Sequence, residues 1–288
     1  MGFKVIFTPL YGVPADASAL AAAQVTAQRF SGRVAVLHVR ADPRTMIPYI
    51  GEGMSGALIE EMIASAEQQA EERASRVRQT FDAWRSKAGM PLKEGSEPDG
   101  PSCSWTETVG RPDTVIARHG RVADLIVVCR PDGENAATTV TEGLEAALLE
   151  SGRPLLVAPL RETDRIGTNV AVAWNGSAEA SRAVAAALPF LESAEAVTII
   201  SIGDSCPPEA DAGALAGYLA QHGVKAKVRT DEVESGKSVG ETLIAAARAA
   251  DADLMVMGAY THSRLRELVF GGVTRVVLSS DLPLLMAH

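Results

Sequence analysis

The sequence has little cysteine, few aromatic residues and no long hydrophobic run. Its three cysteines, Cys103, Cys129 and Cys206, are scattered, so neither a disulfide framework nor a C-x-x-C metal site is expected. No apolar run approaches the roughly 18 residues that span a bilayer, and the first segment, MGFKVIFTPLYGVP, has only a short apolar run broken by proline. We therefore expect a cytoplasmic protein with no membrane anchor and no metal site.

Blocks of basic residues are also lacking. The chain has 27 Lys and Arg against 36 Asp and Glu, a formal net charge of −9. This acidic balance argues against nucleic acid and anionic membranes as general partners. At 288 residues and 47% hydrophobic content, the chain suits a globular protein of about two domains.

What the sequence does contain is an internal repeat. The segment ADLIVVCRPDGENAATTVTEGLEAALLESGRPLLVAP aligns without a gap with ADLMVMGAYTHSRLRELVFGGVTRVVLSSDLPLLMAH. Asp253 follows Asp124 by 129 residues, and Pro283 follows Pro154 by the same number. A constant spacing over such a length indicates two copies of one structural unit.

Each copy is preceded by short apolar segments that alternate with Ala-rich or amphipathic segments. This pattern predicts five strands and four helices in strict alternation, twice over. Such an order predicts two Rossmann-like, doubly wound α/β domains, each with a five-stranded parallel sheet. We place the domains at 1–160 and 161–288, joined by the polar stretch RETDRIGT (161–168). We interpret 91–104 as a surface loop before the third strand.

The candidate ligand crevice lies in the second domain. In doubly wound sheets, ligands bind beyond the carboxyl ends of the strands where the strand order reverses, here at AWNGS (173–177) and from Gly258 onward. The stretch MGAYTHSRLRELVFGGVTR (257–275) predicts a strand, a loop and a helix start. Glycine there allows positive φ or close approach of a ligand, and a helix amino terminus offers N–H groups to an anion. The alternative, that Gly258, Gly271 and Gly272 are only turn and cap glycines, stays open.

Over nearly its whole length the chain resembles a tandem universal stress protein, a family with an adenine-nucleotide alpha-hydrolase-like fold. Members of that family bind ATP with a loop G-x2-G-x9-G-(S/T) after the fourth strand and with an acidic residue at the end of the first strand. Gly258, Thr261 and Gly271 keep this spacing, but Thr261 replaces the second glycine, Gly272 replaces the hydroxyl residue and Asn175 replaces the acid. The resemblance implies an ATP site, with or without Mg2+. The implied binding residues are Trp174, Asn175, Gly176, Ser177, Gly236, Gly258, Ala259, Thr261, Arg264, Gly271, Gly272, Val273 and Thr274.

The first domain departs further from the family pattern. Cys129, Asp132 and Glu142 stand where the second domain has Gly258, Thr261 and Gly271. We expect the Glu142 carboxylate to face any phosphate at that helix start, so that the first domain has lost its nucleotide site. No residue is an evident catalytic base, so slow ATP hydrolysis is the most that we expect.

Two other functional classes remain open. One is a ligand-free interaction or dimerisation module with degenerate loops. The other is a hydrolase or nucleotidyl transferase of the related fold, which would need an S-G-G-x-D-S type loop where this chain has AWNGSAEAS. The resemblance also predicts an intramolecular pseudo-dimer through the last strands, PLLVAPL and PLLMAH. A homodimer or a separate protein partner is left open, and the long amphipathic helix over 57–88 is a solvated face or a partner surface.

Overall fold

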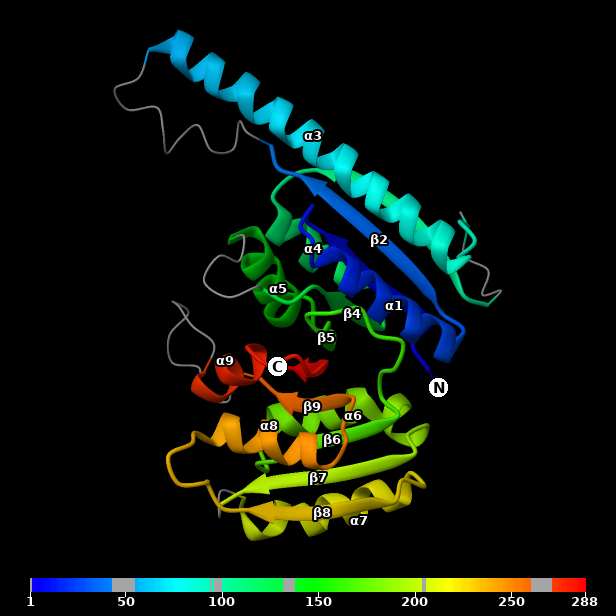
Figure 1. Cartoon of the computed structure of the whole chain (residues 1–288), viewed down its shortest axis with the longest axis vertical. Helices are drawn as coiled ribbons and strands as arrows, with labels where there is room; N and C mark the ends of the chain where they lie inside the picture. Colours follow the sequence, from blue (N-terminus) through cyan, green and yellow to red (C-terminus); the bar gives the residue numbers. More distant parts are fainter. Residues whose placement is uncertain are drawn as a thin grey trace.

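The computed structural model describes residues 2–42, 55–93, 95, 100–131, 138–203, 206–259 and 271–288. All strands in these ranges join one ten-stranded sheet in the order β3-β2-β1-β4-β5-β10-β9-β6-β7-β8, with helices packed on it (Figure 1). No helix in the described ranges is both long enough and apolar enough to cross a membrane.

Each half of the chain repeats the same order of elements, as the sequence predicts. The first half contains β1 (Val5–Leu10), α1 (Asp16–Phe30), β2 (Arg33–Arg40), α3 (Gly56–Ala88), β3 (Ser102–Val109), α4 (Pro112–Gly120), β4 (Leu125–Val128), α5 (Thr138–Glu150) and β5 (Leu155–Val157). The second half contains β6 (Asn169–Ala173), α6 (Ala178–Glu192), β7 (Ala196–Ile202), the 3-10 turn η3 (Pro208–Ala210), α7 (Ala212–Gln221), β8 (Ala226–Asp231), α8 (Val239–Ala249), β9 (Leu254–Gly258), α9 (Gly272–Leu278) and β10 (Leu284–Ala287).

Several helix starts are specified by local side chains. Ser177 caps α6 by accepting from the Ala180 N–H, and Asp211 caps α7 in the same way. Ser238 and Glu241 form a reciprocal capping box at α8, which satisfies two of the N–H groups that a helix start leaves free. The predicted loop over 91–104 is partly wrong, because β3 already begins at Ser102. The predicted helix over 57–88 agrees with α3.

The first and fourth strands of each half lie side by side and parallel, as the crevice prediction requires. β1 pairs with β4 and β6 pairs with β9. The strand order therefore reverses between these strands in each half, and the two crevices open at their carboxyl ends.

The two halves join through their last strands, which confirms the predicted pseudo-dimer. Leu155 on β5 pairs antiparallel with Met286 on β10, and Val157 pairs with Leu284. Every residue of both strands is buried, so the sheet hydrogen bonds continue through the apolar centre of the molecule.

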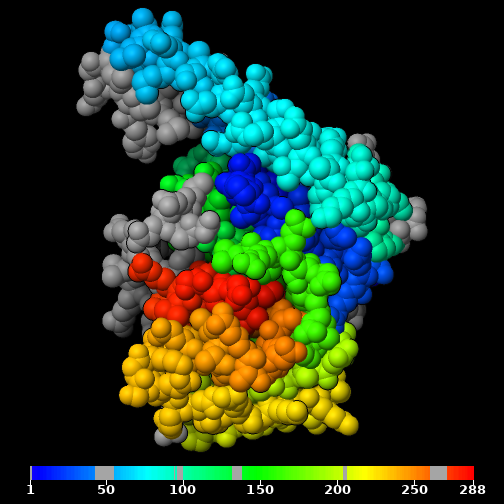
Figure 2. Space-filling model, viewed as in Figure 1, coloured from blue at the N-terminus to red at the C-terminus, as the bar shows by residue number. Residues whose placement is uncertain are grey.

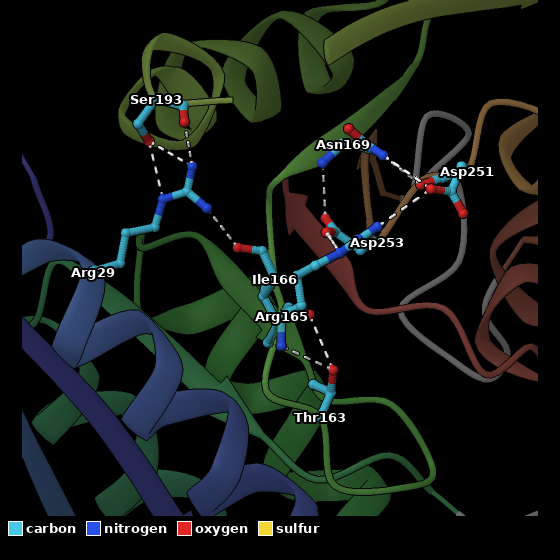
Figure 3. A network of polar contacts seen from close by, with 8 residues as sticks. All are labelled: Arg29, Thr163, Arg165, Ile166, Asn169, Ser193, Asp251 and Asp253. Carbon is cyan, nitrogen blue, oxygen red and sulfur yellow. Dashed lines mark hydrogen bonds and ion pairs between the residues drawn. The ribbon is translucent and has the colours of Figure 1, made fainter. Parts of the chain in front are cut away.

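Away from the sheet, the halves are linked by a polar network around the connecting segment (Figure 3). Arg29 on α1 donates to the carbonyl oxygens of Ile166 at 2.9 Å and Ser193 at 2.6 Å. Arg165 pairs with Asp253 at 2.7 Å, and the Asp253 carboxylate accepts from the Asn169 N–H. These contacts fix the connecting segment against both halves.

Candidate functional site

In the second half, the first strand ends in a turn whose side chains are largely used within the fold. The Trp174 indole N–H donates to the Ala210 carbonyl at 2.8 Å, and the side chain is 8% exposed. The exposed Asn175 accepts from the Ser177 N–H at 3.2 Å through its amide oxygen. Gly176 has φ of +69°, a conformation that other residues adopt at a cost. Asn175 is therefore exposed just after the carboxyl end of β6, whereas Trp174 is part of the core.

Gly258, at the end of β9, is required by packing. A Cβ on Gly258 would lie 2.7 Å from the Glu179 carbonyl carbon and 2.8 Å from Glu179 Cβ. The amino-terminal turn of α6 thus packs directly on the backbone of β9, which brings the 173–177 turn and the end of β9 together at one point. Close helix packing, rather than positive φ, explains this glycine.

Gly271 and Gly272 behave differently. Gly271 is the N-cap of α9 with φ of −51°, and Gly272 is the first residue of the helix, so neither has the positive φ that favours glycine. A Cβ on either residue would meet no described atom within 4 Å, and both residues are exposed. Glycine is a common N-cap residue, which suits Gly271, but no contact with the described residues explains the missing side chain of Gly272.

The remaining predicted site residues lie in α9, just after β9 and in the loop between β8 and α8. Thr274 is 5% exposed within α9, and Val273 precedes it. Ala259 is fully buried, and its N–H donates to the Ala287 carbonyl. Gly236, with φ of +80°, turns the exposed loop between β8 and α8. Thr261 and Arg264 lie outside the described residues.

Sequence reasoning missed Gly240, which sets the position of α9. A Cβ on Gly240 in α8 would lie 2.8 Å from Val276 Cβ and 3.3 Å from the Val273 carbonyl oxygen. The glycine therefore lets α8 approach the first turn of α9. A glycine in the first turn of a capped amphipathic helix is the sequence signal that could have found it.

The equivalent crevice in the first half is filled by Tyr11. Ile6 and Val170 hold the same place in the register of their sheets, which aligns Tyr11-Gly12 with Asn175-Gly176, and both glycines have positive φ. The Tyr11 ring lies against Gly143 on α5, the counterpart of Gly272, where a Cβ would be 2.9 Å from Tyr11 Cε1. A bulky ring thus lies in the first half at a place where, in the second half, a Cβ on Gly272 would meet no described atom within 4 Å.

A buried carboxylate completes this plug. Asp16 is 1% exposed and accepts from three successive backbone N–H groups, those of Tyr11, Gly12 and Val13, at 2.7 to 3.2 Å. Burial raises its pKa to about 6, although these N–H groups oppose the shift. Burial also raises the pKa of the neighbouring Cys129 thiol, which leaves it a poor nucleophile. The second half has Ala180 at the position of Asp16, so the corresponding N–H groups face no carboxylate from that position.

This plug corrects one prediction. Glu142 does not stand at a helix start, because α5 begins four residues earlier at Thr138, and Glu142 is an exposed residue of the helix. The first crevice is blocked by Tyr11 and Asp16 rather than by Glu142. Asp132 lies outside the described residues.

A small cavity of about 30 Å3 remains beside Tyr11, between the ends of β1 and β2 and helices α3 to α5. His38 lines it, 2% exposed, with Nδ1 3.0 Å from the Leu10 carbonyl, and burial lowers its pKa. His38 is therefore a hydrogen-bonded residue of the core. The cavity has room for about one or two water molecules, so it is too small for a nucleotide. Among the described residues, no group of three or more His, Cys, Asp or Glu could hold a metal ion.

Comparison with known proteins identifies the second half. Residues 168–288 match the model of the universal stress protein family. These residues form a universal stress protein domain. The sequence has no match among the curated proteins.

Solved structures extend the likeness of fold to the whole chain. A universal stress protein from Archaeoglobus fulgidus DSM 4304 is similar over 99% of this chain and 96% of its own, with a TM-score of 0.66 and 16% identity. A putative universal stress protein from Pseudomonas aeruginosa UCBPP-PA14 is similar over 99% and 93%, with a TM-score of 0.54 and 16% identity. A functionally unknown protein from P. aeruginosa PAO1 is similar over 99% of this chain and 92% of its own, with a TM-score of 0.55 and 16% identity. At these identities the likeness shows the fold alone: two universal-stress-protein-like units in one chain.

Proposed function

We propose that this protein binds an adenine nucleotide, ATP with Mg2+, in its second universal stress protein domain. In a cytoplasmic stress-response or signalling role, the protein acts through nucleotide binding rather than through ATP hydrolysis. The observation that carries the proposal is the pair Gly271 and Gly272. They lie at the ligand-binding end of the sheet, and neither positive φ nor packing in the described fold demands glycine there. Close approach of a ligand to the backbone is a physical reason for glycine at both positions.

The asymmetry between the two crevices supports a single site per chain. In the first half, the Tyr11 ring and the Asp16 carboxylate occupy the equivalent space and its backbone N–H groups. A carboxylate that already accepts those bonds excludes an anion from them. The second half replaces these residues with Asn175 and Ala180, which leave room and bring no negative charge.

In the proposed complex, the phosphates contact the backbone N–H groups of Gly271, Gly272 and Val273, with Thr274 as a hydroxyl donor. Adenine and ribose lie near Asn175 and Gly236. Asn175 bonds to a base or ribose edge as a neutral amide, so it contributes less than the acidic residue of the family pattern. Gly258 contributes indirectly, by allowing α6 to bring the 173–177 turn to the site.

Calorimetric titration of the full chain with ATP and Mg2+ tests the proposal. Gly271→Val places a branched side chain in the phosphate path, so binding is lost while the free energy of unfolding changes little. Gly56→Val is the matched control, because Gly56 is also exposed at a helix start with no described atom within 4 Å of a Cβ, yet it lies on α3. If the parent protein binds nothing at millimolar ATP, the ligand-free interaction module becomes the better reading.

A further inference from the structure

Helix α3 is far longer than the body on which it packs. It runs from Gly56 to Ala88, and its buried residues, Ala74, Val77 and Phe81, all lie in the carboxyl-terminal half of the helix. The amino-terminal half of the helix projects beyond β2 as an arm (Figures 1 and 2). The apolar stripe does not stop where the body ends, because Ile59 and Ile63 continue it along the arm at helical spacing.

Charge is segregated along the same helix. Residues 56–72 contain five glutamates, Glu60, Glu61, Glu67, Glu71 and Glu72, and no lysine or arginine. Residues 73–88 contain Arg73, Arg76, Arg78, Arg85 and Lys87, with Asp82 as the single acid. An acidic arm is therefore joined end to end to a basic segment that lies on the body. Two such helices attract each other when they lie antiparallel and repel when they lie parallel.

The sequence positions fit an antiparallel pair in detail. A two-fold axis between residues 72 and 73 places Glu60 opposite Arg85 of a second copy and Glu67 opposite its Arg78. The intervals of 7, 11 and 7 residues between positions 60, 67, 78 and 85 are close to whole turns of helix, so the four side chains share one face. The symmetry doubles the contacts to four glutamate–arginine pairs.

The basic partners on that face are held in place and partly open to solvent. Arg78 lies over the rings of Phe81 and Trp105, its Nε is 2.8 Å from an Asp82 carboxylate oxygen, and its side chain is 44% exposed. Arg85 lies 3.9 Å from the same carboxylate and is 36% exposed. Because the Arg78 guanidinium already lies on two aromatic rings, little of its side-chain entropy is lost when a carboxylate from another copy approaches.

We propose that two copies of this chain associate through α3 as an antiparallel pair centred between Glu72 and Arg73. The acidic arm of each copy lies along the basic half of the other, and Ile59 and Ile63 of the arm are covered by the partner's body. The contact runs over about 50 Å, the length of the 33-residue helix. The contact lies on the first half of the chain, whereas the proposed ATP site lies in the second half, so the two proposals are independent.

Sedimentation equilibrium of the full chain is the first test. We expect a dimer at micromolar concentration in low salt and a dissociation constant at least about tenfold weaker in 1 M NaCl, where exposed ion pairs are screened. A chain that stays monomeric at 200 μM in low salt, about the range of a weak protein contact, overturns the proposal.

A charge-swap pair identifies the surface. Glu60→Arg with Glu67→Arg makes the face wholly basic, and Arg78→Glu with Arg85→Glu makes it wholly acidic. Neither double variant should dimerise alone, because each pairs like charges across the axis. An equimolar mixture should form a heterodimer of parental affinity, since every contact then joins opposite charges. Circular dichroism of each variant checks that the fold is kept, and recovery in the mixture shows the same.

The control variant makes the same change in charge on the face of the arm that points away from the proposed partner. Glu61→Arg with Glu72→Arg alters the same helix by the same amount but lies off the shared face, so dimerisation should be unchanged. Dimers that persist in the all-basic variant, or a mixture that fails to associate, overturn the proposal. Loss of the dimer in the control variant does the same, because it implies general charge rather than this register.

Discussion

The ring of Tyr11 occupies the space that any side chain on Gly143 would need. A Cβ on Gly143 would lie 2.9 Å from both Tyr11 Cε1 and Cζ, and the hydroxyl is nearer still. This contact and the Asp16 carboxylate close the first crevice, whereas a Cβ on the matching Gly272 would meet no described atom within 4 Å. The two halves share the same backbone fold and differ in the side chains that lie at the crevice.

Gly143→Ala should destabilise the protein even though it raises helix propensity. Overpacking against the buried ring costs about 1–3 kcal/mol, more than the propensity gain. Gly217→Ala on α7 is the matched control, because its Cβ meets nothing within 4 Å, and it should stabilise by about 0.5–1 kcal/mol. Urea unfolding of both variants measures the difference. Equal effects at the two positions would contradict the plug.

Tyr11→Phe should stabilise the fold. The Tyr11 hydroxyl is buried and has no hydrogen-bond partner in the described structure. Removing an unsatisfied buried hydroxyl while keeping the ring recovers about 1 kcal/mol of desolvation cost. The free energy of unfolding by urea is again the measurement. A loss of stability would mean that the hydroxyl is bonded in solution, through the small cavity beside His38.

Asp16 should make stability depend on pH in an unusual direction. Its pKa in the folded protein is about 6, against 3.8 for an ordinary exposed aspartate, so the folded state binds the proton more tightly. The stabilisation is therefore complete below about pH 4 and is lost as pH rises through 6, by about 3 kcal/mol. Other carboxylates have the opposite slope, so the quantity to measure is the parent protein minus Asp16→Asn.

In the Asp16→Asn variant, the new amide oxygen still accepts from the Gly12 N–H but does not titrate in this range. The difference in unfolding free energy between the two proteins should therefore change between pH 4 and pH 7 in favour of the variant. A difference that stays constant over this range would show that the three N–H groups balance burial and hold the Asp16 pKa near its ordinary value.

Arg130 should be essential to the join between the halves. It is 1% exposed and donates to the carbonyl oxygens of Ala158, Leu278 and Leu282, so it ties the end of β4 to the end of α9 and the start of β10. Burial lowers its pKa to about 10, so it stays charged at neutral pH. Arg130→Met leaves these acceptors buried without a donor and should cost about 3 kcal/mol or more.

Arg29→Met is the comparison for Arg130, because Arg29 also bonds across the halves but lies half-buried, where water replaces lost bonds. It should cost about 1 kcal/mol. Thermal and urea unfolding of both variants would rank them, and a larger loss for Arg29 would contradict the importance of burial here.

The repeat made the architecture predictable. A gapless spacing between Asp124 and Asp253 carries the order of elements from one half to the other, and apolar final strands in both halves predict that they pair. Helix α3 was evident from its period. These features depend on local pattern and on chain register, which a single sequence contains.

The details of the crevices were not predictable in the same way. The contact of Tyr11 with Gly143 joins residues far apart in sequence, and nothing local to either one distinguishes a plug from an exposed turn. The start of α5 at Thr138 shifted Glu142 out of the position that the alignment gave it. The local sequence predicts that Arg130 is a loop residue, and only the fold shows that the end of α9 lies beside it. Side-chain packing across the repeat, rather than pattern, decides these points.

Joining the two units through their last strands also reduces the number of exposed sheet edges from four to two. Two separate five-stranded sheets would expose four edges, and two of those would be the uncharged strands LLV of β5 and LLMA of β10. In the fused chain these strands hide each other, and the surviving edges are β3 and β8. Those strands carry Glu107, Lys227 and Arg229, charges that discourage edge-to-edge pairing with the sheet of another molecule. Duplication within one polypeptide thus protects the molecule from aggregation through the apolar strands β5 and β10.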